Sequence, residues 1–85
     1  MEVPRKRDGL HVRDIDGETV VLDPETERMH TLNATAAFVF GAIDGNRSVK
    51  EISEDLAKHF EVEAEVAARD AREIVRQFCE LDLVV

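Results

Sequence analysis

The sequence has one cysteine, no tryptophan, no tyrosine and no apolar run of the roughly 20 residues that cross a bilayer. Cys79 therefore has no partner for an internal disulfide, and the N-terminus lacks the pattern of a signal peptide. These features predict a cytoplasmic protein without a membrane segment. The four phenylalanines are the only aromatic residues, which leaves little with which to stack nucleic-acid bases.

Basic residues are also scarce, because 11 Lys and Arg face 19 Asp and Glu, giving a net charge of -8. Such a charge repels phosphate backbones, so we expect no nucleic acid as a partner. The length of 85 residues predicts a single domain, residues 1–85. Residues 1–9 are polar and predict a frayed, solvated terminus. Their cluster Arg5-Lys6-Arg7 could also dock on a partner.

No catalytic or metal-binding constellation is present in the sequence. The histidines, His11, His30 and His59, share no short metal-ligand spacing. Cys79 has no histidine within four residues, and the glycines form no phosphate-binding loop. We therefore expect no enzyme activity, no metal and no cofactor.

The first third of the chain predicts three short strands joined by turns. Residues 10–15 alternate apolar and polar side chains, which is typical of a half-buried strand. Asp16-Gly17 is a two-residue hairpin signal, and residues 19–22 form the second strand. Asp23-Pro24-Glu25-Thr26 supplies the next turn, and residues 28–32 return as the third strand. Three strands in sequence predict an antiparallel meander.

The hydrophobic period changes from strand to helix at Asn33, whose side chain suits a helix N-cap. The first helix is predicted from Ala34 to about Ile43, with Phe40 on its buried stripe. Gly45 is expected to end it as a left-handed C-terminal cap.

Two further helices follow, and the first of them begins with a capping box formed by Ser48 and Glu51. The last helix is predicted from about Ala64 to Glu80. Its expected core stripe is Ala67, Ala71, Ile74, Phe78 and Leu81. The apolar tail, residues 83–85, should pack back as a short extended segment. The predicted fold is α+β: a small winged helix-turn-helix-like domain with a three-stranded antiparallel sheet followed by three helices.

Arg69, Arg72 and Arg76 lie at positions i, i+3 and i+7, so they line one stripe of the last helix. One interpretation is a solvated face with ordinary ion pairs, Glu65 with Arg69 and Arg76 with Glu80. The other is an anion-binding wall beside a groove, because guanidinium groups hold carboxylates in a bidentate manner.

The ordered motifs of the chain resemble the PqqD-like family. The resemblance covers roughly residues 10–84 and is carried by Val21 to Thr26, Leu32 to Ala36, Asp44-Gly45, Ser48 to Ile52 and Asp70 to Val84. Asp82 stands where many members have glycine, so we expect a local difference at the exit from the last helix.

This resemblance implies a RiPP recognition element, which binds the leader segment of a ribosomally made precursor peptide and presents it to a modifying enzyme, often a radical SAM enzyme. In the family the leader lies between the third strand and the third helix. The third strand would pair with the peptide, the arginines would attract acidic leader residues, and Ala68, Val75 and Cys79 would form the floor. The expected peptide-binding residues are Arg28, Met29, His30, Thr31, Leu32, Ala68, Arg69, Arg72, Val75, Arg76 and Cys79.

Two alternative functions and the oligomeric state stay open at this stage. A winged-helix DNA-binding or regulatory domain would suit the fold, but DNA binding does not suit the acidic second helix. A structural partner subunit would bind an enzyme without touching the peptide. An open strand edge also allows a homodimer.

Overall fold

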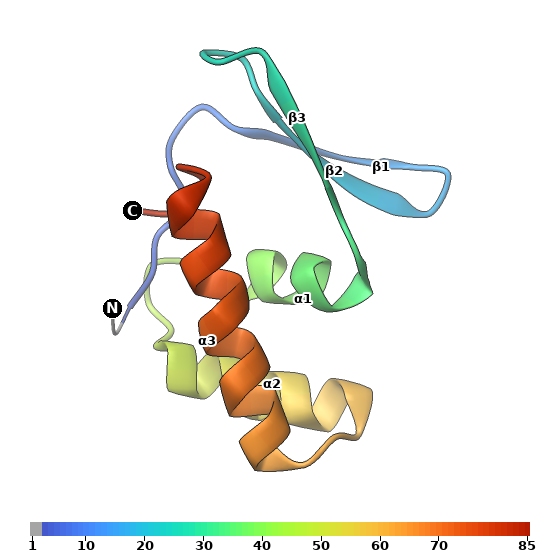
Figure 1. Cartoon of the computed structure of the whole chain (residues 1–85), viewed down its shortest axis with the longest axis vertical. Coiled ribbons are helices and arrows are strands. Elements are labelled where there is room, and N and C mark those ends of the chain that lie inside the picture. Colours follow the sequence, from blue (N-terminus) through green and yellow to red (C-terminus); the bar gives the residue numbers. More distant parts are fainter. Residues whose placement is uncertain (1–2) are drawn as a thin grey trace.

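The computed structural model describes residues 3–85 and contains the predicted elements in the predicted order. They are β1 (His11–Ile15), β2 (Glu18–Asp23), β3 (Arg28–Leu32), α1 (Ala34–Ala42), α2 (Val49–Phe60) and α3 (Ala64–Glu80). The strands form an antiparallel sheet in the order β1-β2-β3. Figure 1 shows this sheet at one end of the molecule, with α1 below it and α3 crossing in front of α2.

The hairpin between β1 and β2 has the turn that Asp16-Gly17 predicts. Both residues have positive φ, 53° and 84°, as a type I′ turn requires. The turn places Ile15 opposite Glu18 and so fixes the register of the whole sheet. The second turn, residues 24–27, pairs Asp23 with Arg28.

β1 is not the half-buried strand that its alternation predicts, because all five of its residues are exposed. Val12 and Ile15 keep 49% and 50% of their surface in solvent. The helices explain this, since α1 contacts β2 and β3 while no described helix contacts β1. In Figure 1 the turn of the β1–β2 hairpin projects beyond the helices, so the core reaches β2 but not β1.

The start of α1 is as predicted, but its end is not. The Oδ1 atom of Asn33 accepts the N–H of Ala36 at 2.8 Å, which caps the first turn. The helix ends at Ala42, and the C-cap residue is Ile43 in an extended conformation. Gly45 has a φ of 83° but lies two residues beyond this cap. The expected glycine cap is therefore wrong, and Gly45 belongs to the loop that leads to α2.

The core is built on the facing sides of β2, α1, α2 and α3, together with Leu32 of β3 and the C-terminal tail. The capping box of α2 is present, with hydrogen bonds of 3.0 and 3.1 Å between Ser48 and Glu51. On α3 the buried residues are Ala67, Ala71, Val75 and Phe78. Leu81 was expected in this stripe but is 42% exposed, because it lies past the end of the helix.

The two ends of the chain pair with each other. Arg5 and Val85 exchange backbone hydrogen bonds of 3.3 and 2.8 Å, and Leu83 is fully buried. The Lys6 ammonium lies 4.9 Å from the centre of the Phe40 ring. The tail thus packs back as an extended segment, as predicted. A frayed terminus does not describe residues 4–7, whereas residues 1–2 lie outside the described residues.

Arg7 ties this paired segment to the sheet. Its guanidinium forms ion pairs with Asp23, whose side chain is almost fully buried, and with the exposed Glu25. The basic cluster of the N-terminus therefore has a structural role, because two of its members contact the sheet and the core. Asp82, at the exit from α3, has a φ of 60°, a left-handed conformation that glycine adopts without strain.

Candidate functional site

The outer edge of β3 is the first feature of interest, because β3 is the last strand of the sheet. In the type I′ hairpin the closing pair, Ile15 and Glu18, is hydrogen-bonded. Hydrogen-bonded and non-bonded pairs then alternate along an antiparallel ladder. On β2 this alternation leaves the N–H and C=O groups of Thr19, Val21 and Asp23 to face β3. Their partners on β3 are Leu32, His30 and Arg28, whose backbone groups therefore face β2. The N–H and C=O groups of Met29 and Thr31 point away from the sheet.

The side chains of β3 divide in the same alternating manner. Leu32 is buried in the core and His30 is half-buried, so both lie on the inner face. Met29 is 63% exposed, and Arg28 and Thr31 are also exposed. Met29 and Thr31, whose backbone groups point away from the sheet, therefore both have exposed side chains.

The flanks of α3 face different parts of the molecule. A helix advances about 100° per residue, so Ala68, Arg72 and Cys79 lie on one side of the buried stripe. Ile74 and Leu81 lie on the other side. In Figure 1 the first turn of α2 is on one side of α3 and β3 on the other. The handedness of the helix places Arg72 toward α2 and Ile74 toward β3.

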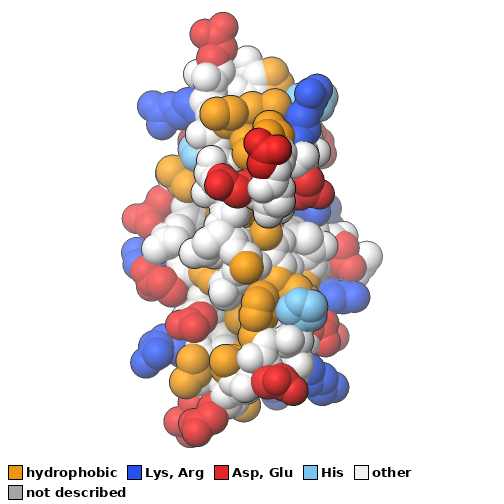
Figure 2. Space-filling model, turned by 90° about the vertical axis from the view of Figure 1, so that its right-hand side faces the viewer, with side chains coloured by type: hydrophobic (Ala, Val, Ile, Leu, Met, Phe, Trp, Pro, Cys, Tyr) orange, Lys and Arg blue, Asp and Glu red, His pale blue; other side chains and the backbone are white. Residues whose placement is uncertain are grey.

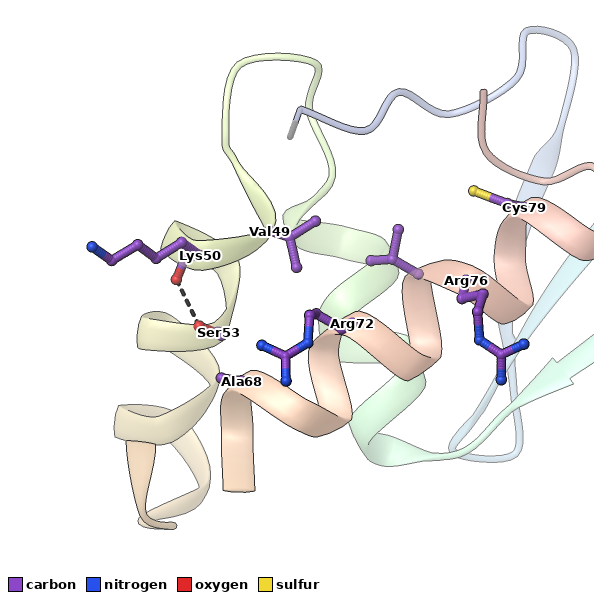
Figure 3. Close-up of a pocket in the computed structure, with 8 residues that line it drawn as sticks. Val49, Lys50, Ser53, Ala68, Arg72, Arg76 and Cys79 are labelled. Atoms are coloured by element: carbon purple, nitrogen blue, oxygen red, sulfur yellow. Dashed lines mark hydrogen bonds between the residues drawn. The ribbon is translucent and has the colours of Figure 1, made fainter. Parts of the chain in front are cut away.

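The flank toward α2 contains a cavity of about 450 Å³. It is lined by Val49, Lys50 and Ser53 of α2 and by Ala68, Arg72, Val75, Arg76 and Cys79 of α3. Figure 3 shows Val49 and the α3 side chains on facing walls, with the Arg72 and Arg76 side chains projecting from α3. Five of the six α3 residues expected in the peptide site thus lie together.

This cavity is not the groove that was expected between β3 and the arginine face, because no residue of β3 lines it. The Cα atoms of α3 and β3 do not approach within 8 Å of each other. The sequence defines which α3 residues share a face, but the flank that meets the sheet is decided by how α3 crosses α1. Arg69 does not line the cavity either. Its side chain is 72% exposed, and its Nε atom lies 3.8 Å from Oδ1 of Asp70.

The arginines differ in their ion pairs. Arg76 contacts Glu73 and lies 3.6 Å from Glu80, as one interpretation of the sequence predicted. The hydrogen bond from Arg76 to Glu73, together with both carboxylates, raises the pKa of Arg76. The predicted pair of Glu65 with Arg69 is absent from the ion pairs of the described residues. Arg72 has no ion pair within residues 3–85.

Val49, Lys50 and Ser53 were missed as lining residues. Ser53 donates a hydrogen bond to the carbonyl of Lys50 at 2.7 Å, so its hydroxyl is satisfied within the helix. No local pattern in the sequence links these residues to α3, because the link depends on the helix crossing.

The three histidines lie on β1, β3 and α2, and no group of three potential metal ligands comes together among residues 3–85. No helix in this range is long and apolar enough to span a membrane.

The fold and its open edge define a small winged-helix-like binding domain. The chain belongs to the PqqD family, since the family model for coenzyme PQQ synthesis protein D matches residues 18–84. A PqqA binding protein from Rhizobium meliloti (strain 1021) is 34% identical over 68 residues, which is 80% of this chain and 67% of that protein. The predicted family is thereby confirmed.

Solved structures agree with this assignment. Lasso peptide synthetase B1, determined with its leader peptide, superposes with a TM-score of 0.85 at 27% identity, covering 96% of both chains. The PqqD part of Methylobacterium extorquens PqqCD, described as a RiPP recognition element, gives a TM-score of 0.81 at 22% identity, covering 98% of this chain and 88% of that one. The predicted fold class is confirmed.

Proposed function

We propose that this chain is a non-catalytic recognition element that binds the leader of a ribosomally made precursor peptide. The leader would add as a strand to the outer edge of β3 and be presented to a peptide-modifying enzyme, of the radical SAM or another class. The observation that carries the proposal is the unpaired edge of β3, with the backbone groups of Met29 and Thr31 directed outward. Membership of the PqqD family supports it.

Strand addition gives affinity through backbone hydrogen bonds, while side chains select the sequence. An added strand would lie about 4.8 Å from β3. The Cα atoms of α3 and β3 stay more than 8 Å apart, so α3 does not itself pair with the backbone of this edge. The flank of α3 on the β3 side carries the half-buried Ile74, and the exposed Leu81 follows at the end of the helix. The leader would place apolar side chains against these two residues.

Figure 2 shows the side of the molecule that is on the right in Figure 1, where apolar side chains lie among acidic and basic ones over both the sheet and the helices. A contact between the leader and Arg69, Arg72 or Arg76 remains a prediction. Their side of α3 lies away from β3, and Arg72 and Arg76 line the separate cavity.

A titration with the leader of the precursor encoded beside the gene of this chain tests the proposal. We expect the amide signals of Met29 and Thr31 to shift more than that of His30, because the His30 N–H is already bonded to β2. Thr31→Pro should preserve the fold, since proline is tolerated where an edge N–H faces solvent. It should weaken leader binding by about 5- to 150-fold, equivalent to about 1–3 kcal/mol for a lost backbone partner.

Thr31→Val is the matched control, because it changes the side chain but keeps the outward N–H. It should bind the leader within about threefold of the wild type. Equal affinities of Thr31→Pro and Thr31→Val would show that the leader does not pair with β3.

A homodimer is proposed for the same edge, because an unpaired strand can pair with a second copy. Sedimentation at rising concentration would detect the dimer. Addition of the leader should dissociate it, since both compete for the same backbone groups. A dimer that persists at saturating leader would have to use a different surface.

A further inference from the structure

We infer that the cavity between α2 and α3 is a second docking site, which takes an acidic segment of the modifying enzyme carrying one apolar side chain. This inference rests on the proposed function, because it assigns a partner to the surface that the leader leaves free. It concerns the flank of α3 opposite to β3.

The composition of the cavity differs from that of the protein as a whole. The chain has 19 acidic residues and a net charge of -8, yet none of those within residues 3–85 lines the cavity. The apolar lining comes from both helices, with Val49 from α2 and Ala68 and Val75 from α3. Lys50, Arg72 and Arg76 are the cationic lining residues, and in Figure 3 the Lys50 side chain projects away from α3. The surface is therefore apolar at its base and positive at its rim.

Two of these three cations are available to a partner. Arg76 is already paired with Glu73 and Glu80. Lys50 and Arg72 have no ion pair within residues 3–85, and both side chains are exposed. A guanidinium group that borders an apolar surface favours a carboxylate ligand, because the bidentate contact is only partly screened by water. The volume of about 450 Å³ lies in the range of ligand pockets, about 300–1,000 Å³.

The position of the cavity indicates which partner can bind there while the leader is bound to β3. A leader paired with β3 is separated from the cavity by the body of α3, and a helix with its side chains is about 10–12 Å across. The cavity thus remains open when the edge of β3 is occupied. A module that presents a peptide must contact the enzyme while holding the leader. An acidic segment with an apolar anchor fits the charge and the base of this cavity, and the enzyme is the partner that has to bind at that moment.

The chemistry is tested first with a defined probe, the peptide acetyl-Glu-Glu-Leu-Glu-Glu-amide, titrated into the full chain labelled for NMR. We expect saturable shifts at Ser53, Ala68 and Val75. Arg72→Glu should weaken binding at least about tenfold, because it replaces attraction by repulsion. Arg69→Glu is the matched control, with the same charge change on the same helix outside the cavity, and should change the affinity less than about twofold.

Whether the acidic segment belongs to the modifying enzyme is tested with the purified enzyme encoded beside the precursor gene. Its affinity for the leader-bound chain should fall at least about tenfold for Arg72→Glu and stay within about twofold for Arg69→Glu. Equal loss in both variants, or none in either, would overturn the inference.

The leader provides the last arm of the test. Leader titrated alone should shift the β3 amides and leave Ser53 and Ala68 unchanged. Shifts at Ser53 and Ala68 with leader alone would assign the cavity to the peptide and overturn the inference. A leader that shifts neither region contradicts the proposed function, whereas the enzyme measurement repeated without leader still decides whether the cavity docks the enzyme.

Discussion

Leu83→Ala is the most direct test of whether the C-terminal tail is part of the core. Leu83 is 0% exposed, and its N–H donates to the carbonyl of Phe78 at 2.9 Å. Truncation of a fully buried leucine costs about 2–5 kcal/mol, from lost burial plus the cavity that remains. For a domain of this size each kcal/mol lowers Tm by about 4–8 °C, so we expect a decrease of about 8–40 °C.

The assay is thermal unfolding followed by circular dichroism, with a urea titration to give the free energy of unfolding. Val85→Ala is the control, because Val85 lies in the same tail but is 64% exposed. It should change the free energy of unfolding by less than about 0.5 kcal/mol. If Leu83→Ala were as mild as Val85→Ala, the tail would not be packed, and its pairing with Arg5 would not contribute to the fold.

Two further predictions concern side chains that satisfy backbone groups. Ser48→Ala should lower the free energy of unfolding by about 1 kcal/mol in a urea titration, whereas Ser48→Asp, another good N-cap, should restore most of it. Burial raises the pKa of Asp23, but hydrogen bonds from Thr26 and Glu25 and the charge of Arg7 outweigh it and hold the pKa below its ordinary 3.8. The carboxylate of Asp23 then binds a proton more tightly in the unfolded chain than in the folded one, so the free energy of unfolding should fall as pH is lowered from about 5 to about 2. Asp23→Asn should flatten this pH dependence. An unchanged slope in that variant would exclude Asp23 as the source of the dependence.

Local signals in the sequence predicted the elements because their physics is local. Asp16-Gly17 allows two consecutive positive φ angles, so the hairpin and its register follow from two residues. The capping box of Ser48 and Glu51 likewise fixes the start of α2. Gly45 misled the prediction of the helix end, because a positive φ is needed equally in a helix cap and in the loop that follows.

Burial was harder to predict, because it depends on which elements come together. Val12 alternates correctly for an inward-facing residue, yet it remains half exposed because no described helix covers β1. The segment around Arg5 is polar and predicts solvent exposure. Its backbone is nevertheless paired with the tail at Val85, a contact between opposite ends of the chain. The pattern of a sequence tells which residues share one face of a helix or strand. Which other element packs against that face depends on the tertiary structure.

The same distinction governs the functional surfaces. The sequence grouped Arg72 with the apolar residues beside it, and the structure confirms that they lie together. The sequence could not tell that this group faces α2, because either flank of α3 could have been turned toward the sheet.

The consequence is a testable separation of two activities in one small domain. If β3 binds the leader and the opposite flank of α3 binds the enzyme, Thr31→Pro should weaken leader binding while the acidic probe still binds with unchanged affinity. Arg72→Glu should weaken binding of the acidic probe and leave leader binding unchanged, because Arg72 faces the cavity whereas Thr31 lies on the other side of α3. Sites with no shared contacts contribute nearly additively, so the double variant should combine both losses without a further one. A single groove would instead make each variant weaken both ligands, and the two mutations would then fail to add.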